Sequence, residues 1–352
     1  MPRSFSADNL SGCDLNFTPS RIAVLGAGSW GTALAVHCAG LGLPVTLWVY
    51  EEDLAHRMLE KKENDVYLPG VELPANIVPT NSFEKCLTGA ELVLSVVPSH
   101  VSREVWDQAH VYLPVDAIVV NATKGIEEKT LLTSSGILVD AIGEGILARR
   151  VTLSGPNFAR EISRGLPAAS VVASENIEIA SKVQGILNSD ALRLYTNSDV
   201  VGVEIAGALK NVIAIAVGIC DGLELGHNAR AALITRGLAE IARLGQALGG
   251  DPLTFQGLAG VGDLVLTCTG DLSRNRTLGL GLGSGETLDE ITDSTPMVAE
   301  GVRTTRSARG LAKREKVEMP ITEEVYSVLY RGKDPRKALR DLMSRALKEE
   351  GI

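Results

Sequence analysis

The stretch Ile22-Ala23-Val24-Leu25-Gly26-Ala27-Gly28-Ser29-Trp30-Gly31 decides the fold. Its four leading apolar residues predict a short buried strand, and residues 32–39 predict a helix directly after the glycines. Gly-x-Gly-x-x-Gly between a strand and a helix is the dinucleotide fingerprint, because the glycines let a pyrophosphate approach the backbone and the helix N-terminus stabilises its charge. A tight turn without a ligand is the alternative. The stretch supplies five candidate cofactor-binding residues: Gly26, Gly28, Ser29, Trp30 and Gly31.

The end of the next predicted strand bears on the choice of cofactor. Residues 44–49 read as this strand, and Glu51, Glu52 and Asp53 follow it. An acidic residue at this point commonly binds the adenosine ribose hydroxyls, and Glu51 is the candidate. Three carboxylates would repel a phosphorylated ribose, and Arg57 is the only arginine nearby, so the sequence favours NAD over NADP. A solvated acidic helix start explains the same residues equally well.

Further apolar runs extend the pattern to about residue 195. Strands alternating with helices indicate an α/β domain with a mainly parallel, doubly wound, Rossmann-type sheet, which we place at residues 20–196. Ligands of such sheets bind beyond the carboxyl ends of the strands, where Lys124 and Gly155 fall. The additional predicted strands are 91–98, 117–121, 151–153, 169–173 and 191–195.

Strand signals stop after this point, and residues 197–352 are expected to form an all-helical domain. Asn228 and Asp334 are predicted helix caps, the latter with Pro335 at the first helical position. The polar, irregular residues 1–19 are expected to be a disordered extension without an apolar signal core. The predicted helices are 200–220, 229–248, 298–314, 321–331 and 335–349.

One predicted helix carries a lysine in an apolar run, Glu204-Ile205-Ala206-Gly207-Ala208-Leu209-Lys210-Asn211, which continues to Ile219. A helix that is apolar all round is buried, and a buried lysine is costly unless it is paired. The small neighbours Ala206, Gly207 and Ala214 leave room for a ligand beside Lys210. A lysine at the helix edge that snorkels to water is the alternative. The run is too short to span a bilayer.

Composition excludes several classes of protein. A chain of 352 residues is long enough for two domains, and its formal net charge of −9 argues against nucleic-acid and anionic-membrane binding. The five cysteines are an odd number without paired spacing, which suits free thiols in a reducing cytoplasm. The five histidines form no metal-ligand pair with a neighbouring carboxylate, so we expect no metal site.

Two polar clusters stand out in the second half. Asp263 lies between glycines and an apolar run, and Ser273-Arg274-Asn275-Arg276 follows shortly afterwards. A guanidinium offers the planar fork that grips phosphate oxygens, and an adjacent amide adds a donor. A surface helix start is the alternative for the two arginines. A further turn places Glu300 beside Gly301.

Together these motifs resemble the bacterial type of NAD(P)-dependent glycerol-3-phosphate dehydrogenase. The resemblance covers nearly everything after residue 20 and implies a 6-phosphogluconate-dehydrogenase-like arrangement of the two domains. Other dehydrogenases of the β-hydroxyacid type share the fold and a lysine but not this set. The matching segments are 26–35, 67–70, 123–127, 153–156, 204–211, 260–264, 273–275 and 300–301.

The resemblance implies a role for each matching residue. Lys210 is the general acid/base of dihydroxyacetone phosphate reduction to sn-glycerol 3-phosphate, Asp263 orients it, and Arg274 and Asn275 bind the phosphate. The implied substrate residues are Lys124, Gly155, Asn157, Lys210, Asn211, Asp263, Thr267, Ser273, Arg274 and Asn275. The implied cofactor residues are Ser29, Trp30, Tyr67, Lys124, Ala159, Arg274, Val298 and Glu300.

Two departures from the family pattern matter. Tyr50 and Glu51 stand where members often carry histidine or arginine, which leaves the choice between NAD and NADP open, and Asn157 stands where serine is more usual. We expect a cytoplasmic homodimer that supplies glycerophospholipid synthesis, without nucleic-acid partners or stable membrane insertion. A related dehydrogenase acting on another hydroxy acid or alcohol is the second hypothesis, and a dinucleotide-binding protein without turnover is the third.

Overall fold

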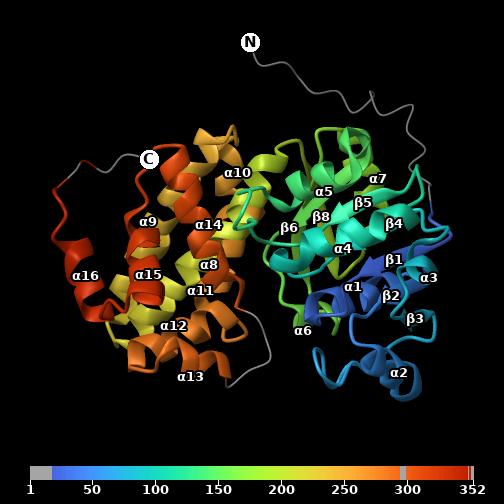
Figure 1. Ribbon diagram of the computed structural model, residues 1–352, viewed down its shortest axis with the longest axis horizontal. Coiled ribbons are helices and arrows are strands. Elements are labelled where there is room, and N and C mark those ends of the chain that lie inside the picture. Colours follow the sequence, from blue (N-terminus) through green and yellow to red (C-terminus); the bar gives the residue numbers. More distant parts are fainter. Residues whose placement is uncertain (1–17, 294–298, 348, 350–352) are drawn as a thin grey trace, which may run out of the picture.

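The computed structural model describes residues 18–293, 299–347 and 349. A sheet-containing half, blue to green in Figure 1, lies beside an all-helical half, yellow to red. The extension expected at residues 1–19 falls outside the described residues except for residues 18 and 19, and Val298 falls outside them too.

The sheet half contains a single eight-stranded sheet of order β3-β2-β1-β4-β5-β6-β7-β8. All neighbouring strands are parallel except β6 and β7, which are antiparallel. The prediction of a mainly parallel, doubly wound sheet is confirmed. The strands are β1 (Ile22–Leu25), β2 (Val45–Trp48), β3 (Ile77–Thr80), β4 (Leu92–Ser95), β5 (Ile118–Asn121), β6 (Arg150–Ser154), β7 (Ala168–Ala173) and β8 (Leu192–Asn197).

Helices cover both faces of the sheet because successive strand residues point to opposite sides. Val24 of β1 packs in one apolar cluster with Leu34, whereas its neighbour Leu25 packs in another with Trp106. The helices of this half are α1 (Ser29–Gly40), α2 (Glu52–Lys61), α3 (Phe83–Leu87), α4 (Ser102–Ala109), α5 (Ser134–Ile142), α6 (Ala159–Ile162) and α7 (Ile177–Leu187).

The sequence pattern missed β3, and its position explains why. The strand lies at the edge of the sheet and pairs only with β2, with Leu47 opposite Pro79. Proline lacks the N–H that a central strand needs, so it usually argues against a strand assignment. Val78 is 52% exposed, which leaves only a short half-buried pattern to detect.

In the helical half, the expectation of a helical second domain matches the observed elements, but some ends differ. Gly226 opens the helix predicted from residue 229, and Leu225 rather than Asn228 is its N-cap, because Glu224 in the left-handed region turns the chain earlier. The helix predicted to residue 349 ends at Met343, and the described residues after it, 344–347 and 349, are exposed. Asp334 is a cap as predicted, accepting from the Lys337 amide at 2.9 Å.

The helices of this half, as the described residues show them, are α8 (Val200–Gly222), α9 (Gly226–Ala247), α10 (Pro252–Gln256), α11 (Asp263–Thr269), α12 (Arg274–Ser284), α13 (Leu288–Asp293), α14 (Glu300–Arg314), α15 (Pro320–Arg331) and α16 (Pro335–Met343).

Helix α8 is the centre of the helical half. The run was expected to be too short to span a bilayer, but the helix is 23 residues long and is the one helix among the described residues with the length and hydropathy of a membrane span. Its apolar window is 94% buried inside the protein. Helices α9, α11, α12 and α14 pack around it, which accounts for its apolar character on all sides.

Backbone contact joins α8 to α12. A Cβ atom added to Gly218 would overlap the carbonyl oxygen of Arg276, and one added to Gly279 would overlap the carbonyl oxygen of Ile215. Gly222 and Gly283 meet in the same way one turn further along. Only glycine permits this approach, so the middle and end of α12 are held closely against the C-terminal end of α8.

Candidate active site

Two lysines share one carboxylate between the two halves of the molecule. Lys210, in the middle of α8, is 7% exposed and its Nζ donates to Oδ1 of Asp263 at the start of α11. Lys124, in the loop after β5, donates to Oδ2 of Asp263 at 2.6 Å and to the Gly155 carbonyl at 3.2 Å. Asp263 is fully buried, and its Oδ1 also accepts a longer hydrogen bond from Thr267 Oγ1 at 3.4 Å.

This environment lowers the pKa of Lys210 to about 7. Burial is the main cause, because the charged form loses hydration, and the neighbouring Lys124 cation acts in the same direction while Asp263 opposes both. Lys210 therefore exchanges its proton near neutral pH. A group with such a pKa can serve as acid in one direction of a reaction and as base in the other.

The small residues around Lys210 have different surroundings. Ala206 and Ala214 belong to the helical core. A Cβ atom on Gly207 would lie 2.9 Å from Ser154 Oγ and 3.7 Å from Lys124 Cγ. Gly207 thus contacts Ser154 and the Lys124 stem, and the room that the sequence assigned to a ligand beside Lys210 stays a prediction.

The start of α12 presents the predicted phosphate-binding group. Ser273 caps the helix by accepting from the Arg276 amide at 3.3 Å, and Arg274 Nη2 reaches across to Ser29 Oγ at 2.5 Å. Arg276 instead pairs with Asp221 at 2.8 Å inside the helical half. Of the two arginines, it is therefore Arg274 that bridges the two halves.

Amide side chains fix the neighbouring elements. Asn275 Nδ2 donates to Asn211 Oδ1 at 2.9 Å, and the Gly301 amide donates to Asn275 Oδ1 at 2.9 Å. These bonds tie the start of α14 to α12 and α8. Asn211 follows Lys210 directly in α8.

Two further predicted substrate residues lie close to the lysines. Thr267 Oγ1 donates to the Asp263 carbonyl at 2.6 Å, which steadies the first turn of α11. Asn157 Nδ2 donates to Ser170 Oγ at 2.5 Å and to the Gly155 carbonyl at 3.4 Å. Asn157 Oδ1 is buried and has no hydrogen-bond partner within the described chain, so the amide retains an open acceptor.

The glycine loop has the shape of a pyrophosphate cradle. Gly26 adopts a φ of +109°, and a Cβ atom on Gly31 would overlap the Gly26 carbonyl oxygen. Around Gly28, by contrast, a Cβ atom would meet nothing within 4 Å. Helix α1 begins at the next residue, so its free amides face this open space. The loop therefore fits a dinucleotide.

Glu51, which the sequence predicts as the partner of the adenosine ribose, lies in the loop between β2 and α2. It precedes α2 and accepts a hydrogen bond from the Tyr67 hydroxyl at 2.7 Å, which raises the pKa of Tyr67 to about 12. Arg57 is bound to Asp53 and Asp65 and so does not reach toward this point as a counter-ion. Asp53 matches the alternative of a solvated helix start, because its side chain is 80% exposed.

Trp30, Ala159 and Glu300 are further predicted cofactor residues within the described part of the chain. Trp30 and Ala159 pack on a small cluster formed by Ala33, Leu68 and Val71. Glu300, from α14, accepts from the Ser99 amide at 3.2 Å and from the Ser99 hydroxyl at 2.5 Å, which joins the helical half to the loop after β4. Burial raises the pKa of Glu300.

Sequence reasoning missed two buried residues that shape the site. Asn64 is fully buried and its Nδ2 donates to the Ala27 carbonyl and to Thr32 Oγ1, both at 2.8 Å, so it supports the glycine loop. Glu204 was part of the quoted lysine motif but was given no role, although it joins α8 to the sheet. Asn64 lies beside the matching segment 67–70, which was the only available signal.

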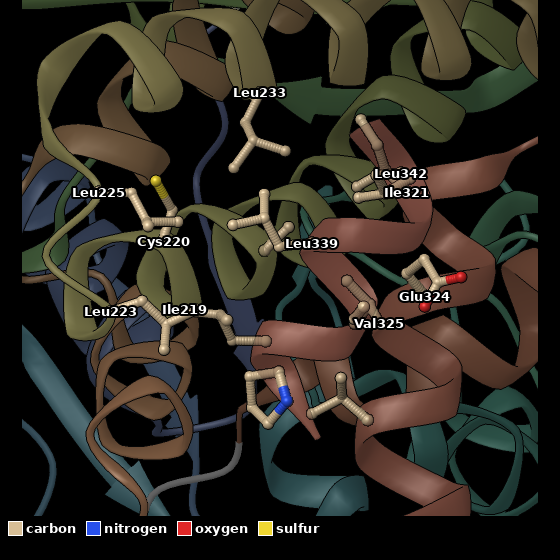
Figure 2. A pocket seen from close by; sticks show the side chains of 14 residues that line it. Ile219, Cys220, Leu223, Leu225, Leu233, Ile321, Glu324, Val325, Leu339 and Leu342 are labelled. Atoms are coloured by element: carbon tan, nitrogen blue, oxygen red, sulfur yellow. The ribbon is translucent and has the colours of Figure 1, made fainter. Parts of the chain in front are cut away.

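A separate apolar cavity is not this site. It lies at the C-terminal end of α8, has a volume of about 40 Å³ and is walled by α9, α15 and α16 (Figure 2). Its lining includes Leu223, Leu233 and Val325, and Glu324 is the one carboxylic acid among its lining residues, paired with Lys333. None of the predicted site residues lines it, and it is far smaller than the few hundred Å³ of typical ligand pockets.

Comparison with known proteins gives concordant matches. Residues 21–180 match the model of the NAD-dependent glycerol-3-phosphate dehydrogenase N-terminus, and residues 199–340 match that of its C-terminus. Glycerol-3-phosphate dehydrogenase (NAD(P)+) of Syntrophobacter fumaroxidans is 53% identical over 94% of this chain and 97% of its own. That of Geobacter metallireducens is 54% identical over 94% and 98%. The crystal structure of glycerol-3-phosphate dehydrogenase from Coxiella burnetii covers 93% of this chain and 99% of its own, with a TM-score of 0.89 and 39% identity.

Proposed function

The chain belongs to the NAD-dependent glycerol-3-phosphate dehydrogenase family, and from this premise we propose how its own residues carry out the reaction. It is an NAD(P)-dependent oxidoreductase that interconverts dihydroxyacetone phosphate and sn-glycerol 3-phosphate. The observation that carries the residue assignment is the buried Lys210, whose pKa is about 7 and which shares Asp263 with Lys124. The direct test is loss of NADH absorbance on addition of dihydroxyacetone phosphate.

Lys210 is the proton donor to the substrate ketone oxygen in the reducing direction and the acceptor from the hydroxyl in the other. The nicotinamide, when bound, supplies or accepts the hydride. Asp263 holds the Lys210 ammonium in place, and Lys124 adds a second positive charge that stabilises the developing negative charge on oxygen. Gly155, Asn157, Asn211 and Thr267 complete the walls around the reacting end of the substrate.

Arg274, with Ser273 and Asn275, binds the phosphate end of the substrate. Binding energy from this remote group then positions the ketone against Lys210. We expect Arg274→Ala to raise the KM for dihydroxyacetone phosphate by about 10- to 150-fold, because a hydrogen bond to a charged group contributes about 1.5–3 kcal/mol. Steady-state kinetics at saturating NADH measure this.

Arg276→Ala is the matched control for this variant. Arg276 lies on the same helix but pairs with Asp221, so its loss should leave the KM within about threefold of the wild-type value. An unchanged KM for dihydroxyacetone phosphate in the Arg274→Ala variant would contradict the assignment of Arg274 to phosphate binding.

The glycine loop, Glu51, Tyr67, Lys124, Ala159, Arg274, Val298 and Glu300 form the proposed cofactor site. Glu51 would accept hydrogen bonds from a ribose diol and repel a ribose phosphate. We therefore expect kcat/KM to be at least about tenfold higher for NADH than for NADPH, a difference of about 1.4 kcal/mol. Parallel initial-rate measurements with the two cofactors decide this.

Variants of the acidic pair refine the cofactor test. Glu51→Gln should reduce the ratio of kcat/KM for NADH to kcat/KM for NADPH. Glu52→Gln should leave this ratio unchanged, because Tyr67 holds Glu51 in place. Preference of the wild-type enzyme for NADPH would contradict the assignment of Glu51.

We also propose that the enzyme works in the cytoplasm as a homodimer and supplies sn-glycerol 3-phosphate for glycerophospholipid synthesis. Membership of the family supports this setting. The free, buried thiols of Cys38, Cys86, Cys220 and Cys268 suit a reducing compartment.

A further inference from the structure

Glu204 is a buried carboxylate that joins α8 to the sheet half. It is 7% exposed and lies less than two helical turns before Lys210. It accepts hydrogen bonds from the Ser135 amide at 3.0 Å, Ser135 Oγ at 2.7 Å, Asn121 Nδ2 at 3.1 Å and Thr152 Oγ1 at 3.3 Å. These donors are all uncharged and come from α5, β5 and β6, so one side chain fixes α8 against three elements.

The same carboxylate also bears on the second lysine. Asn121 donates to Glu204 through Nδ2, while its Oδ1 accepts from the Thr123 amide at 3.3 Å. Ser134 Oγ, at the start of α5, donates to the Thr123 carbonyl at 3.2 Å. Thr123 directly precedes Lys124, so the loop that carries Lys124 is shaped by contacts that begin at Glu204.

We propose that Glu204 is a positioning residue that sets the distance between Lys210 and Lys124 and thereby the geometry of the proton transfer assigned to Lys210. This inference rests on the proposed function. Lys210 is placed through α8, and Lys124 is placed through Asn121 and Thr123. Gly207, between Glu204 and Lys210, lies against the Lys124 stem, so a shift of α8 along the sheet would move the two ammonium groups relative to Asp263.

A carboxylate suits this position better than an amide. Oε1 of Glu204 accepts from the Ser135 amide, Asn121 Nδ2 and Thr152 Oγ1, and Oε2 accepts from Ser135 Oγ, so all four bonds end on a group that can carry a negative charge. Glutamine has the same shape but no charge, and its NH₂ group would take the place of Oε2, so the hydrogen bond from Ser135 Oγ would be lost or reversed. Glu204→Gln therefore weakens these charge-assisted bonds without leaving a cavity, and it tests the anchor rather than the packing.

Glu240 provides a matched control. It is also a buried glutamate, 1% exposed, and it accepts from the Ile321 amide at 2.6 Å, the Thr322 amide at 3.2 Å and Thr322 Oγ1 at 3.1 Å. It joins α9 to α15 within the helical half and touches neither lysine. Glu240→Gln thus imposes a similar loss of buried hydrogen bonds away from the site.

The experiment compares the two glutamine variants in the full-length enzyme. We expect Glu204→Gln to lower kcat by about 10- to 100-fold, because displacement of reacting groups by about 1 Å has this effect. The ionisation near pH 7 in the pH profile of kcat should shift as well, since Asp263, Lys124 and Cys268 face Lys210 and would change their distances to it. NADH binding, measured by fluorescence titration, should stay within about threefold of wild type.

The outcomes separate positioning from stability. Glu240→Gln should lower the melting temperature but keep kcat and the pH profile of the wild type. A Glu204→Gln enzyme with a lowered melting temperature but wild-type kcat and pH profile would overturn the proposal. If this variant does not fold, Ser135→Ala takes its place, since it removes only the 2.7 Å bond and should still lower kcat by several-fold. Absence of dihydroxyacetone phosphate reduction by the wild type would instead contradict the proposed function itself.

Discussion

Replacing Lys210 with alanine should lower kcat by about two to four orders of magnitude, the range expected for loss of general acid–base catalysis. No other described side chain combines burial beside Asp263 with a pKa near neutrality, so nothing can take over the proton transfer at the ketone oxygen. NADH affinity should be nearly unchanged, because Lys210 lies on α8 and not on the glycine loop. Stopped-flow or steady-state kinetics with fluorescence titration measure both quantities.

The pH dependence supplies a second criterion for Lys210. Its pKa is about 7, so the ammonium needed for ketone reduction is lost as the pH rises through about 7. The neutral amine needed for the reverse reaction is lost as the pH falls through the same value. These opposite limbs should both vanish in Lys210→Met, which keeps the side-chain volume. Near-normal turnover in either variant would remove Lys210 from the chemistry.

Asp263→Asn should produce the second large effect. The substitution leaves Lys210 and Lys124 without their shared anion, and breaking a buried ion pair in this way costs about 3–5 kcal/mol of unfolding free energy. The pKa of Lys210 should fall further, because Asp263 is the partner that raises it. We expect kcat for ketone reduction at pH 7 to drop by about 100- to 1000-fold, since both orientation and protonation of the acid are lost.

Asp221 offers a control of the same kind. This carboxylate also bridges two cations, Arg230 at 2.7 Å and Arg276 at 2.8 Å, but away from Lys210. Asp221→Asn should reduce the melting temperature and leave kcat within about threefold. Wild-type turnover in the Asp263 variant would show that the shared carboxylate has no part in the reaction.

The sequence predicted those elements whose signals are local. The strand, glycine turn and helix of residues 22–39 can be predicted from neighbouring residues alone. The burial of α8 can likewise be predicted from its own apolar sequence. Helix α12 could not be predicted in the same way, because Gly279, Gly281 and Gly283 resemble a loop. Those glycines disfavour a helix locally by about 1 kcal/mol each, yet two of them make the contact with α8. Tertiary packing overrides propensity there.

The site shows the same division between local and distant information. The motifs around Lys124, Lys210 and Asp263 could be picked out one by one, and their resemblance to a family suggested a shared role. The sequence could not predict that these three side chains meet, because Asp263 lies 53 residues from Lys210 and 139 residues from Lys124 along the chain. Glu204 had no visible role for the same reason, since its partners lie 52 to 83 residues away.

The backbone contact between α8 and α12 has a consequence for substrate choice. Lys210 stands on one of these helices and Arg274 begins the other, and no flexible side chain lies between the helices at Gly218 and Gly279. On the roles proposed for them, the fixed spacing of the two helices limits the distance between the group that contacts the carbonyl oxygen and the group that binds the phosphate. We therefore expect a homologous ketone phosphate lengthened by one carbon to be a poorer substrate than dihydroxyacetone phosphate.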